Sequence, residues 1–119
     1  MSKREPLRMK PITESLEKKR RQRFSDARKT ALALSDFLVK TYNANKVVLI
    51  GSLCDEQRFD SHSDIDLCVE GIPSDSYFRA VGESLLQASP FDVDLIPIEH
   101  ASERMHKHVM EGEVLYGKA

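Results

Sequence analysis

The acidic residues Asp64 and Asp66 are the first candidates for chemistry in this sequence, because they stand two positions apart in an otherwise apolar stretch, SDIDLCVE. A strand over residues 65–70 is predicted there. Strand side chains alternate between faces, so Asp64 and Asp66 point to the same side. Neighbouring carboxylates repel each other and are costly to bury unless a cation pairs with them. Since their oxygens suit a hard ion, the pair predicts a site for Mg²⁺ or Mn²⁺.

A third candidate, Asp94, lies in the stretch FDVDLIPI, where a strand over residues 91–98 is predicted. Asp92 and Asp94 share one face of that strand, again by alternation. If the two strands are neighbours, Asp94 joins Asp64 and Asp66 around one metal site. Three converging carboxylates suit a two-metal transfer of a phosphoryl or nucleotidyl group. Charges on edge strands are the structural alternative, but strands this rich in Val, Ile and Leu are typical of a sheet centre.

The elements that must hold these residues follow from apolar periodicity. Residues 12–42 form a long amphipathic helix, whose stripe of Phe24, Ala27, Ala31, Leu34, Leu38 and Tyr42 recurs every three or four positions. Residues 46–50 are a buried strand that ends at the turn Gly51-Ser52. A helix over residues 74–88 follows, with its inward face made by Tyr77, Phe78, Val81, Leu85 and Leu86.

The last part of the chain is predicted as a helix that starts at Ser102 and runs through Met110, with Gly112 as its C-cap and a short strand over residues 114–116. The fold class is therefore α/β (α+β): a small mixed sheet with helices packed on one side and a long N-terminal helix. Residues 1–11 are expected to be a flexible basic tail. Residues 12–119 are expected to be a single domain.

The motifs together resemble the minimal nucleotidyltransferase (MNT) family of the DNA polymerase β nucleotidyltransferase superfamily. The resemblance rests on Gly51-Ser52, on the segment SDIDL and on the later segment VDLI. It covers about residues 46–117, which would be the catalytic core. The combination of the three motifs is specific, whereas each alone is common.

The resemblance implies a role for each motif residue. Gly51 and Ser52 would hold nucleotide phosphates through backbone N–H groups and the hydroxyl. Asp64 and Asp66 would bind the metals. Asp94 would be the third metal ligand and the base that orients the acceptor hydroxyl.

The resemblance also implies the reaction and a partner. A nucleoside monophosphate, AMP from ATP, would pass to an acceptor hydroxyl with release of pyrophosphate. MNT proteins often pair with HEPN proteins, which implies an antitoxin that adenylylates a tyrosine of a HEPN toxin. The alternative is a non-catalytic module that neutralises a partner by docking. It is favoured by the altered loop GSLCDEQR. This loop has no arginine at the position where family members often carry one, although Arg58 follows nearby.

Charge is distributed unevenly along the chain. Residues 1–46 hold 13 Lys and Arg against 5 Asp and Glu, a net charge of +8, whereas the rest has a net charge of −9. A basic arm on an acidic domain permits contact with nucleic acid, and a nucleic-acid-tailoring enzyme is a further alternative. We do not favour it, because no aromatic residues interleave with the basic cluster at residues 18–23 to stack on bases.

The overall composition limits the class of protein to which the chain can belong. The chain has 119 residues, of which 40% are hydrophobic and 31% charged, which suits one globular domain. No apolar run approaches the roughly 20 residues that span a bilayer. Two cysteines without CxxC spacing indicate a reduced, cytoplasmic protein. The apolar stripe of the first helix serves a core or a dimer interface, so a homo-oligomer is possible.

Overall fold

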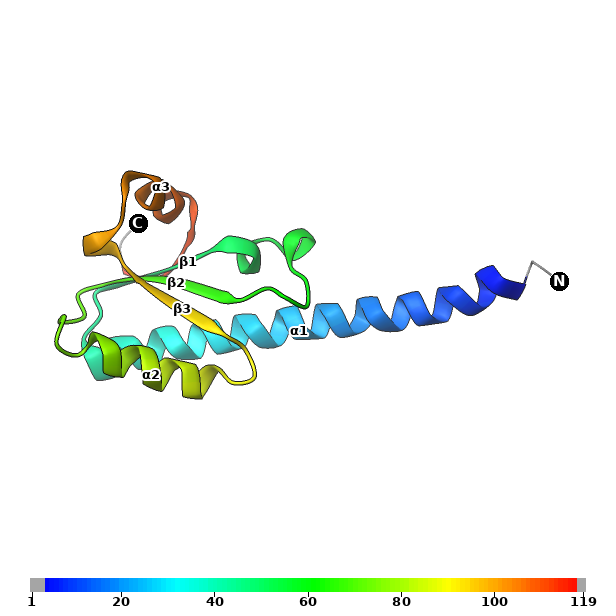
Figure 1. Cartoon of the computed structure of the whole chain (residues 1–119), viewed down its shortest axis with the longest axis horizontal. Coiled ribbons are helices and arrows are strands. Elements are labelled where there is room, and N and C mark those ends of the chain that lie inside the picture. The colour runs from blue at the N-terminus through cyan, green and yellow to red at the C-terminus, as the bar shows by residue number, and fades with distance from the viewer. Residues whose placement is uncertain (1–3, 118–119) are drawn as a thin grey trace.

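The computed structural model describes residues 4–117 of the chain, and its elements follow one another as helix, two strands, helix, strand, helix and strand (Figure 1). They are α1 (Arg4–Tyr42), β1 (Lys46–Ile50), β2 (Ile65–Glu70), α2 (Tyr77–Ala88), β3 (Val93–Pro97), α3 (Glu103–Glu111) and β4 (Glu113–Tyr116). Short 3-10 turns, η1 (Gly51–Cys54), η2 (Glu56–Arg58) and η3 (Ile98–His100), lie between them. No helix within residues 4–117 combines the length and apolar character needed to cross a membrane.

The four strands form one mixed sheet in the order β3-β2-β1-β4. β1 pairs antiparallel with β2 and with β4, whereas β2 and β3 are parallel and are joined by α2. A parallel pair needs a crossover connection of this kind, which the chain supplies between Glu70 and Val93. The predicted mixed sheet, including its short last strand, is confirmed.

The main core lies between one face of the sheet and the helices α1 and α2. The predicted stripe of α1 faces it, because Ala27, Ala31, Leu34, Leu38 and Tyr42 are buried there. Residues 43–45 then end the helix through Asn43, whose φ is +59°. The stripe therefore serves the core of this chain rather than a dimer interface.

The expectation that all helices pack on one side was wrong for α3. Val109 of α3 packs with Val48, Cys68 and Ile98 in a second cluster, on the face of the sheet opposite α1 and α2. Figure 1 shows α3 on the other side of the sheet from the two longer helices. The reason is that alternate residues of β1 and β2 are apolar on this face too, so it also needs a cover.

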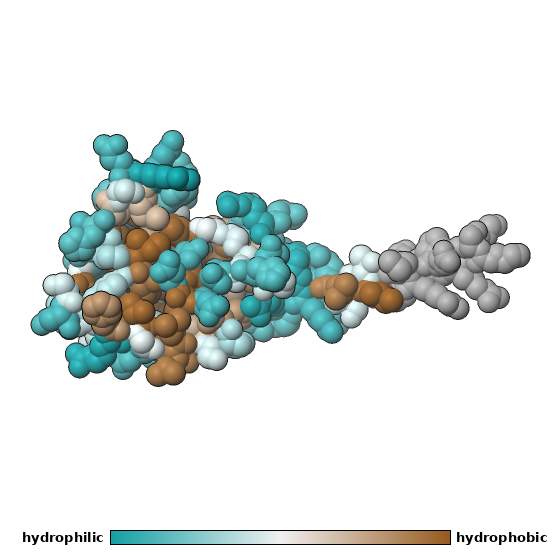
Figure 2. Space-filling view, in the orientation of Figure 1, coloured by the Kyte–Doolittle hydropathy of each residue, from teal (hydrophilic) through white to brown (hydrophobic). Residues whose placement is uncertain are grey.

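The predicted inward face of α2 was also partly wrong. Phe78 and Leu86 are 89% and 81% exposed, and Leu85 is exposed as well. Small residues face the core in their place, namely Ala80, Ser84 and Ala88. Small side chains permit close packing of α2 against the core, which it shares with α1. Figure 2 shows the resulting apolar surface over α2.

The first helix begins earlier than the sequence predicted. Residues 4–11, expected to be a tail, continue α1 in the structure, whereas residues 1–3 lie outside the described part. At 1.5 Å per residue, a helix of 39 residues is roughly 58 Å long, close to the 65 Å longest extent of the molecule. Its N-terminal part therefore projects beyond the sheet (Figure 1).

Candidate active site

The Gly51-Ser52 turn lies directly against Asp66. Because Ile50 of β1 pairs with Asp66 of β2, the chain leaving β1 turns next to that carboxylate. Gly51 has a φ of +82°, and a Cβ atom there would lie 2.8 Å from Oδ2 of Asp66. Only glycine satisfies both the backbone conformation and the close approach. Ser52 follows it within η1 and is half-buried.

The sheet register brings Asp66 and Asp94 together. They are paired positions of the parallel strands β2 and β3, so their side chains leave the same face of neighbouring strands. Asp64 directly precedes β2 and lies close enough for its charge to raise the pKa of Asp66. The carboxylate of Asp66 is half-buried, whereas Asp64 and Asp94 are exposed. The two strands that carry the acidic residues are therefore neighbours, as predicted.

The carboxylates interact through repulsion. Burial raises the pKa of Asp66, and the negative charges of Asp94 and Asp64 raise it further. Within residues 4–117, none of the three carboxylates has an ion pair or a hydrogen bond. Like charges gathered on one face of the sheet are the electrostatic condition that a bound metal ion relieves.

A metal ion fits this donor set in its chemistry. All three candidates offer oxygen ligands, which Mg²⁺ and Mn²⁺ prefer. Among the described residues, however, no group of three or more His, Cys, Asp or Glu side chains is already arranged as a metal site. Asp64, Asp66 and Asp94 are thus neighbours on one face rather than a closed ligand set, and binding requires their side chains to turn toward one point.

Two groups behind the carboxylates are held in their neutral forms. Burial, followed by the charges of Asp66 and Asp94, raises the pKa of Cys68 to about 11. The Tyr77 hydroxyl donates a hydrogen bond to the Leu95 carbonyl, and burial together with the Asp94 charge raises its pKa to about 12. Cys68 is fully buried and packs in the second core cluster.

A small cavity beside Gly51 contains basic residues that sequence reasoning did not assign. Its volume is about 110 Å³, and Arg58 and His108 are among its lining residues, together with Cys54 and Glu111. His108 comes from α3, which is distant in the sequence, so only the fold brings it here. The sequence offered no signal for it beyond a histidine without a zinc-ligand spacing.

Two residues of the basic cluster at residues 18–23 make contacts within the molecule. Arg20 donates hydrogen bonds to the loop after Gly51-Ser52, and the guanidinium of Arg23 lies 4.7 Å from the centre of the Phe91 ring. Lys18, Lys19 and Arg21 are exposed. The cluster is therefore only partly exposed to solvent.

A turn of this kind beside carboxylates on adjacent strands is suited to the transfer of phosphoryl or nucleotidyl groups. Comparison with known families agrees: the chain belongs to the polymerase beta nucleotidyltransferase family, whose sequence model matches residues 33–119. The predicted family is thereby confirmed, and the protein is a nucleotidyltransferase. A comparison with curated proteins gave no match.

Solved structures of toxin–antitoxin systems share the fold. An MntA–HepT toxin–antitoxin structure is 20% identical, with a TM-score of 0.57 over 76% of this chain and 73% of that chain. A toxin–antitoxin structure with AMP-PNP is 22% identical, with a TM-score of 0.60 and 73% of each chain covered. A tri-AMPylated Shewanella oneidensis HEPN toxin in complex with MNT antitoxin is 21% identical, with a TM-score of 0.57 over 77% of this chain and 73% of that chain.

Proposed function

We propose that this nucleotidyltransferase is metal-dependent and transfers AMP from ATP to a tyrosine hydroxyl of a HEPN toxin, and so acts as an antitoxin. The observation that carries the proposal is the pairing of Asp66 with Asp94 beside the Gly51 turn. The similar structures with AMP-PNP and with an AMPylated HEPN toxin support the choice of nucleotide and acceptor. Transfer of AMP would block the modified hydroxyl and add negative charge to it.

In this proposal Asp64, Asp66 and Asp94 hold Mg²⁺ or Mn²⁺, which supplies stabilisation of the charge that develops on the phosphate oxygens. Gly51 and Ser52 contact the phosphates through backbone N–H groups, and the absence of a Cβ at residue 51 keeps the approach to Asp66 open. Arg58 and His108 line the cavity next to this turn, and the guanidinium of Arg58 contributes positive charge toward the pyrophosphate portion.

The bonds balance in a single displacement. The tyrosine oxygen forms a bond to the α-phosphorus of ATP, the bond from that phosphorus to the bridging oxygen breaks, and pyrophosphate leaves. Asp94, exposed at the edge strand, orients the tyrosine hydroxyl and accepts its proton. Most of the rate enhancement in such a reaction comes from positioning and electrostatic stabilisation.

The test is mass spectrometry of a HEPN toxin incubated with the protein, ATP and Mg²⁺. The proposal predicts AMP on a tyrosine of the toxin, and no modification when the Asp64→Asn/Asp66→Asn variant replaces the wild-type protein. An unmodified toxin with the wild-type protein, under conditions in which the two proteins bind, would overturn it.

A docking module is the second candidate function. It is favoured by the exposed apolar residues Phe78 and Leu86 on α2, which the core does not use. The Asp64→Asn/Asp66→Asn variant separates the two functions. Neutralisation of the toxin by this variant would support docking, whereas its loss, with binding retained, would support AMP transfer.

A further inference from the structure

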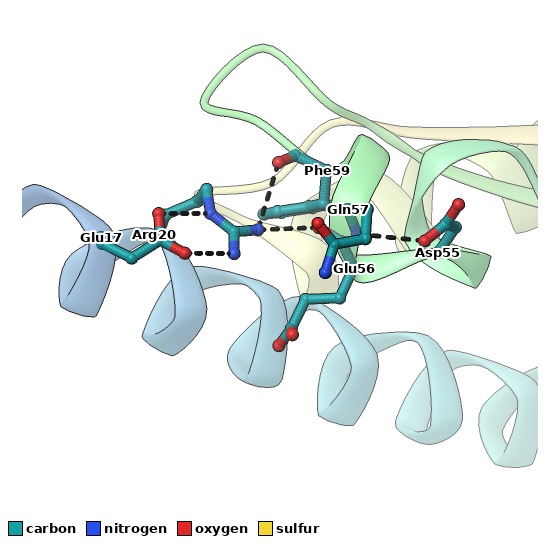
Figure 3. A network of polar contacts seen from close by, with 6 residues as sticks. All are labelled: Glu17, Arg20, Asp55, Glu56, Gln57 and Phe59. Atoms are coloured by element: carbon teal, nitrogen blue, oxygen red, sulfur yellow. Dashed lines mark hydrogen bonds and ion pairs between the residues drawn. The ribbon is translucent and has the colours of Figure 1, made fainter.

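The loop of residues 53–63 connects the Gly-Ser turn to Asp64, and α1 binds it through Arg20. Nη1 of Arg20 donates hydrogen bonds to the carbonyl oxygens of Glu56, at 2.7 Å, and Phe59, at 3.4 Å. The other side of the guanidinium donates two bonds to the carboxylate of Glu17. Figure 3 shows this network between α1 and the loop. Glu17 thus fixes the orientation of the Arg20 guanidinium toward the loop.

Two further residues of α1 contact the same loop. The ring of Phe24 packs edge-to-face on Phe59, with ring centres 5.3 Å apart, and Phe59 is only 2% exposed. Nη1 of Arg28 donates to the Leu53 carbonyl at 3.1 Å. Nη2 of Arg28 contacts the carboxylate of Glu113 at 2.6 Å, which joins the loop to β4 as well.

The three residues Arg20, Phe24 and Arg28 are spaced by four positions, so they follow one side of α1 turn by turn. Their contacts extend from Leu53 at the start of the loop to Phe59, four residues before its end. All three precede residue 33, where the match to the family model begins. The contacts therefore come from a part of the chain that the family pattern does not cover.

We propose that Arg20, Phe24 and Arg28 form a loop clamp that fixes loop 53–63 and thereby positions the groups at its two ends, Gly51-Ser52 and Asp64. None of the three reaches the carboxylates, so they are positioning residues rather than catalytic ones. The inference rests on the proposed function, since it assigns them a part in the same transfer.

The physical reason lies in the loop itself. At its start, the Cys54 thiol donates a hydrogen bond to the Leu49 carbonyl of β1. From Asp55 onward its own hydrogen bonds are local, such as that of the Gln57 N–H to Asp55 and that of the His62 N–H to Asp60. Such turns shape the loop but do not fix it relative to the sheet. The two arginines and the buried Phe59 ring provide that attachment. The planar guanidinium of Arg20 holds the Glu17 carboxylate on one side while it donates to loop carbonyls on the other, which an ammonium group cannot do in the same geometry.

Hydrogen–deuterium exchange of the nucleotide-free protein tests the clamp. We compare Arg20→Gln and the milder Arg20→Lys with Arg21→Gln, a matched control at an exposed position without a hydrogen bond to the described loop. The clamp predicts that amides of residues 53–63 exchange about tenfold faster in Arg20→Gln, with an intermediate effect in Arg20→Lys. Amides of β1 and β2 should exchange as in the wild type. Unchanged loop exchange in Arg20→Gln would overturn the clamp.

Steady-state transfer by the same variants tests the positioning role. We expect kcat to fall about tenfold in Arg20→Gln, without recovery at saturating ATP, while Arg21→Gln keeps the wild-type kcat. Faster loop exchange with an unchanged kcat would overturn the role in positioning. Absence of transfer by the wild-type protein would overturn the proposed function instead, and the exchange comparison would still decide whether the clamp holds the loop.

Discussion

Asp66→Asn should stabilise the metal-free protein while it abolishes transfer. In the folded protein, burial and the charges of Asp94 and Asp64 raise the pKa of Asp66 above the ordinary 3.8. A carboxyl group with a raised folded pKa destabilises the fold when it is ionised. The penalty is absent below pH 3.8, because both states are then protonated, and it grows as the pH rises through the folded pKa. Above that pKa the Asp66→Asn variant is therefore more stable than the wild-type protein, because its amide carries no charge.

The size of the effect follows from the sheet register. Neighbouring strands lie about 4.8 Å apart, so the paired carboxylates of Asp66 and Asp94 are separated by roughly 5 Å. At an effective dielectric constant of about 40–80, two such charges repel by about 1–2 kcal/mol. Because Asp94 is exposed, solvent screening reduces this to about 1 kcal/mol. For a chain of 119 residues that is a rise in Tm of about 4 °C.

The assay is thermal unfolding in the presence of a chelator at several values between about pH 3.5 and 7.5, a range that spans the ionisation of the carboxyl group. Asp75→Asn is the matched control, because Asp75 is exposed and carries the same change of charge. The stabilisation should increase with pH in Asp66→Asn alone and should disappear when Mg²⁺ is added to the wild type. A variant less stable than the wild type throughout this range, without metal, would refute the electrostatic reasoning.

Three further predictions follow from the geometry. Gly51→Ala should lower the free energy of unfolding by about 1–3 kcal/mol and abolish transfer, because residue 51 has a positive φ and a Cβ there would contact Asp66. A variant as stable as the wild type in a denaturant titration would contradict this. Arg58→Gln should raise the KM for ATP severalfold with an unchanged Tm, and an unchanged KM would remove this residue from the phosphate site. Phe78→Ser combined with Leu86→Ser should change the free energy of unfolding by less than about 0.5 kcal/mol, as measured in urea, and a larger loss would mean that these side chains do contribute to the core.

The sequence was informative where local pattern determines structure. Alternation along β2 correctly separated the half-buried Asp66 from the buried Ile65 and Leu67, and the spacing of α1 correctly identified its buried stripe. The pairing of Asp66 with Asp94 depended on which strands are neighbours, and the family resemblance supplied that information. Their roles as metal ligands, like those of Gly51 and Ser52 toward phosphate, remain predictions.

The errors arose where tertiary contacts decide. Hydrophobicity alone placed Phe78 and Leu86 inside, but the buried face of α2 carries the small residues Ala80, Ser84 and Ala88. The position of α3 depended on the apolar character of the second face of the sheet. The sequence did not single out Arg20 within the basic cluster, because its loop partners lie 36 and 39 residues away in the sequence.

Label transfer tests the central claim most directly. The protein is incubated with Mg²⁺ and ATP labelled at either the α- or the γ-phosphate, in lysate from its own source, beside the Asp64→Asn/Asp66→Asn variant. The account predicts a protein band labelled from the α-phosphate only, and no label with the variant. Label from the γ-phosphate only, or α-label that persists in the variant, would contradict nucleotidyl transfer by these carboxylates.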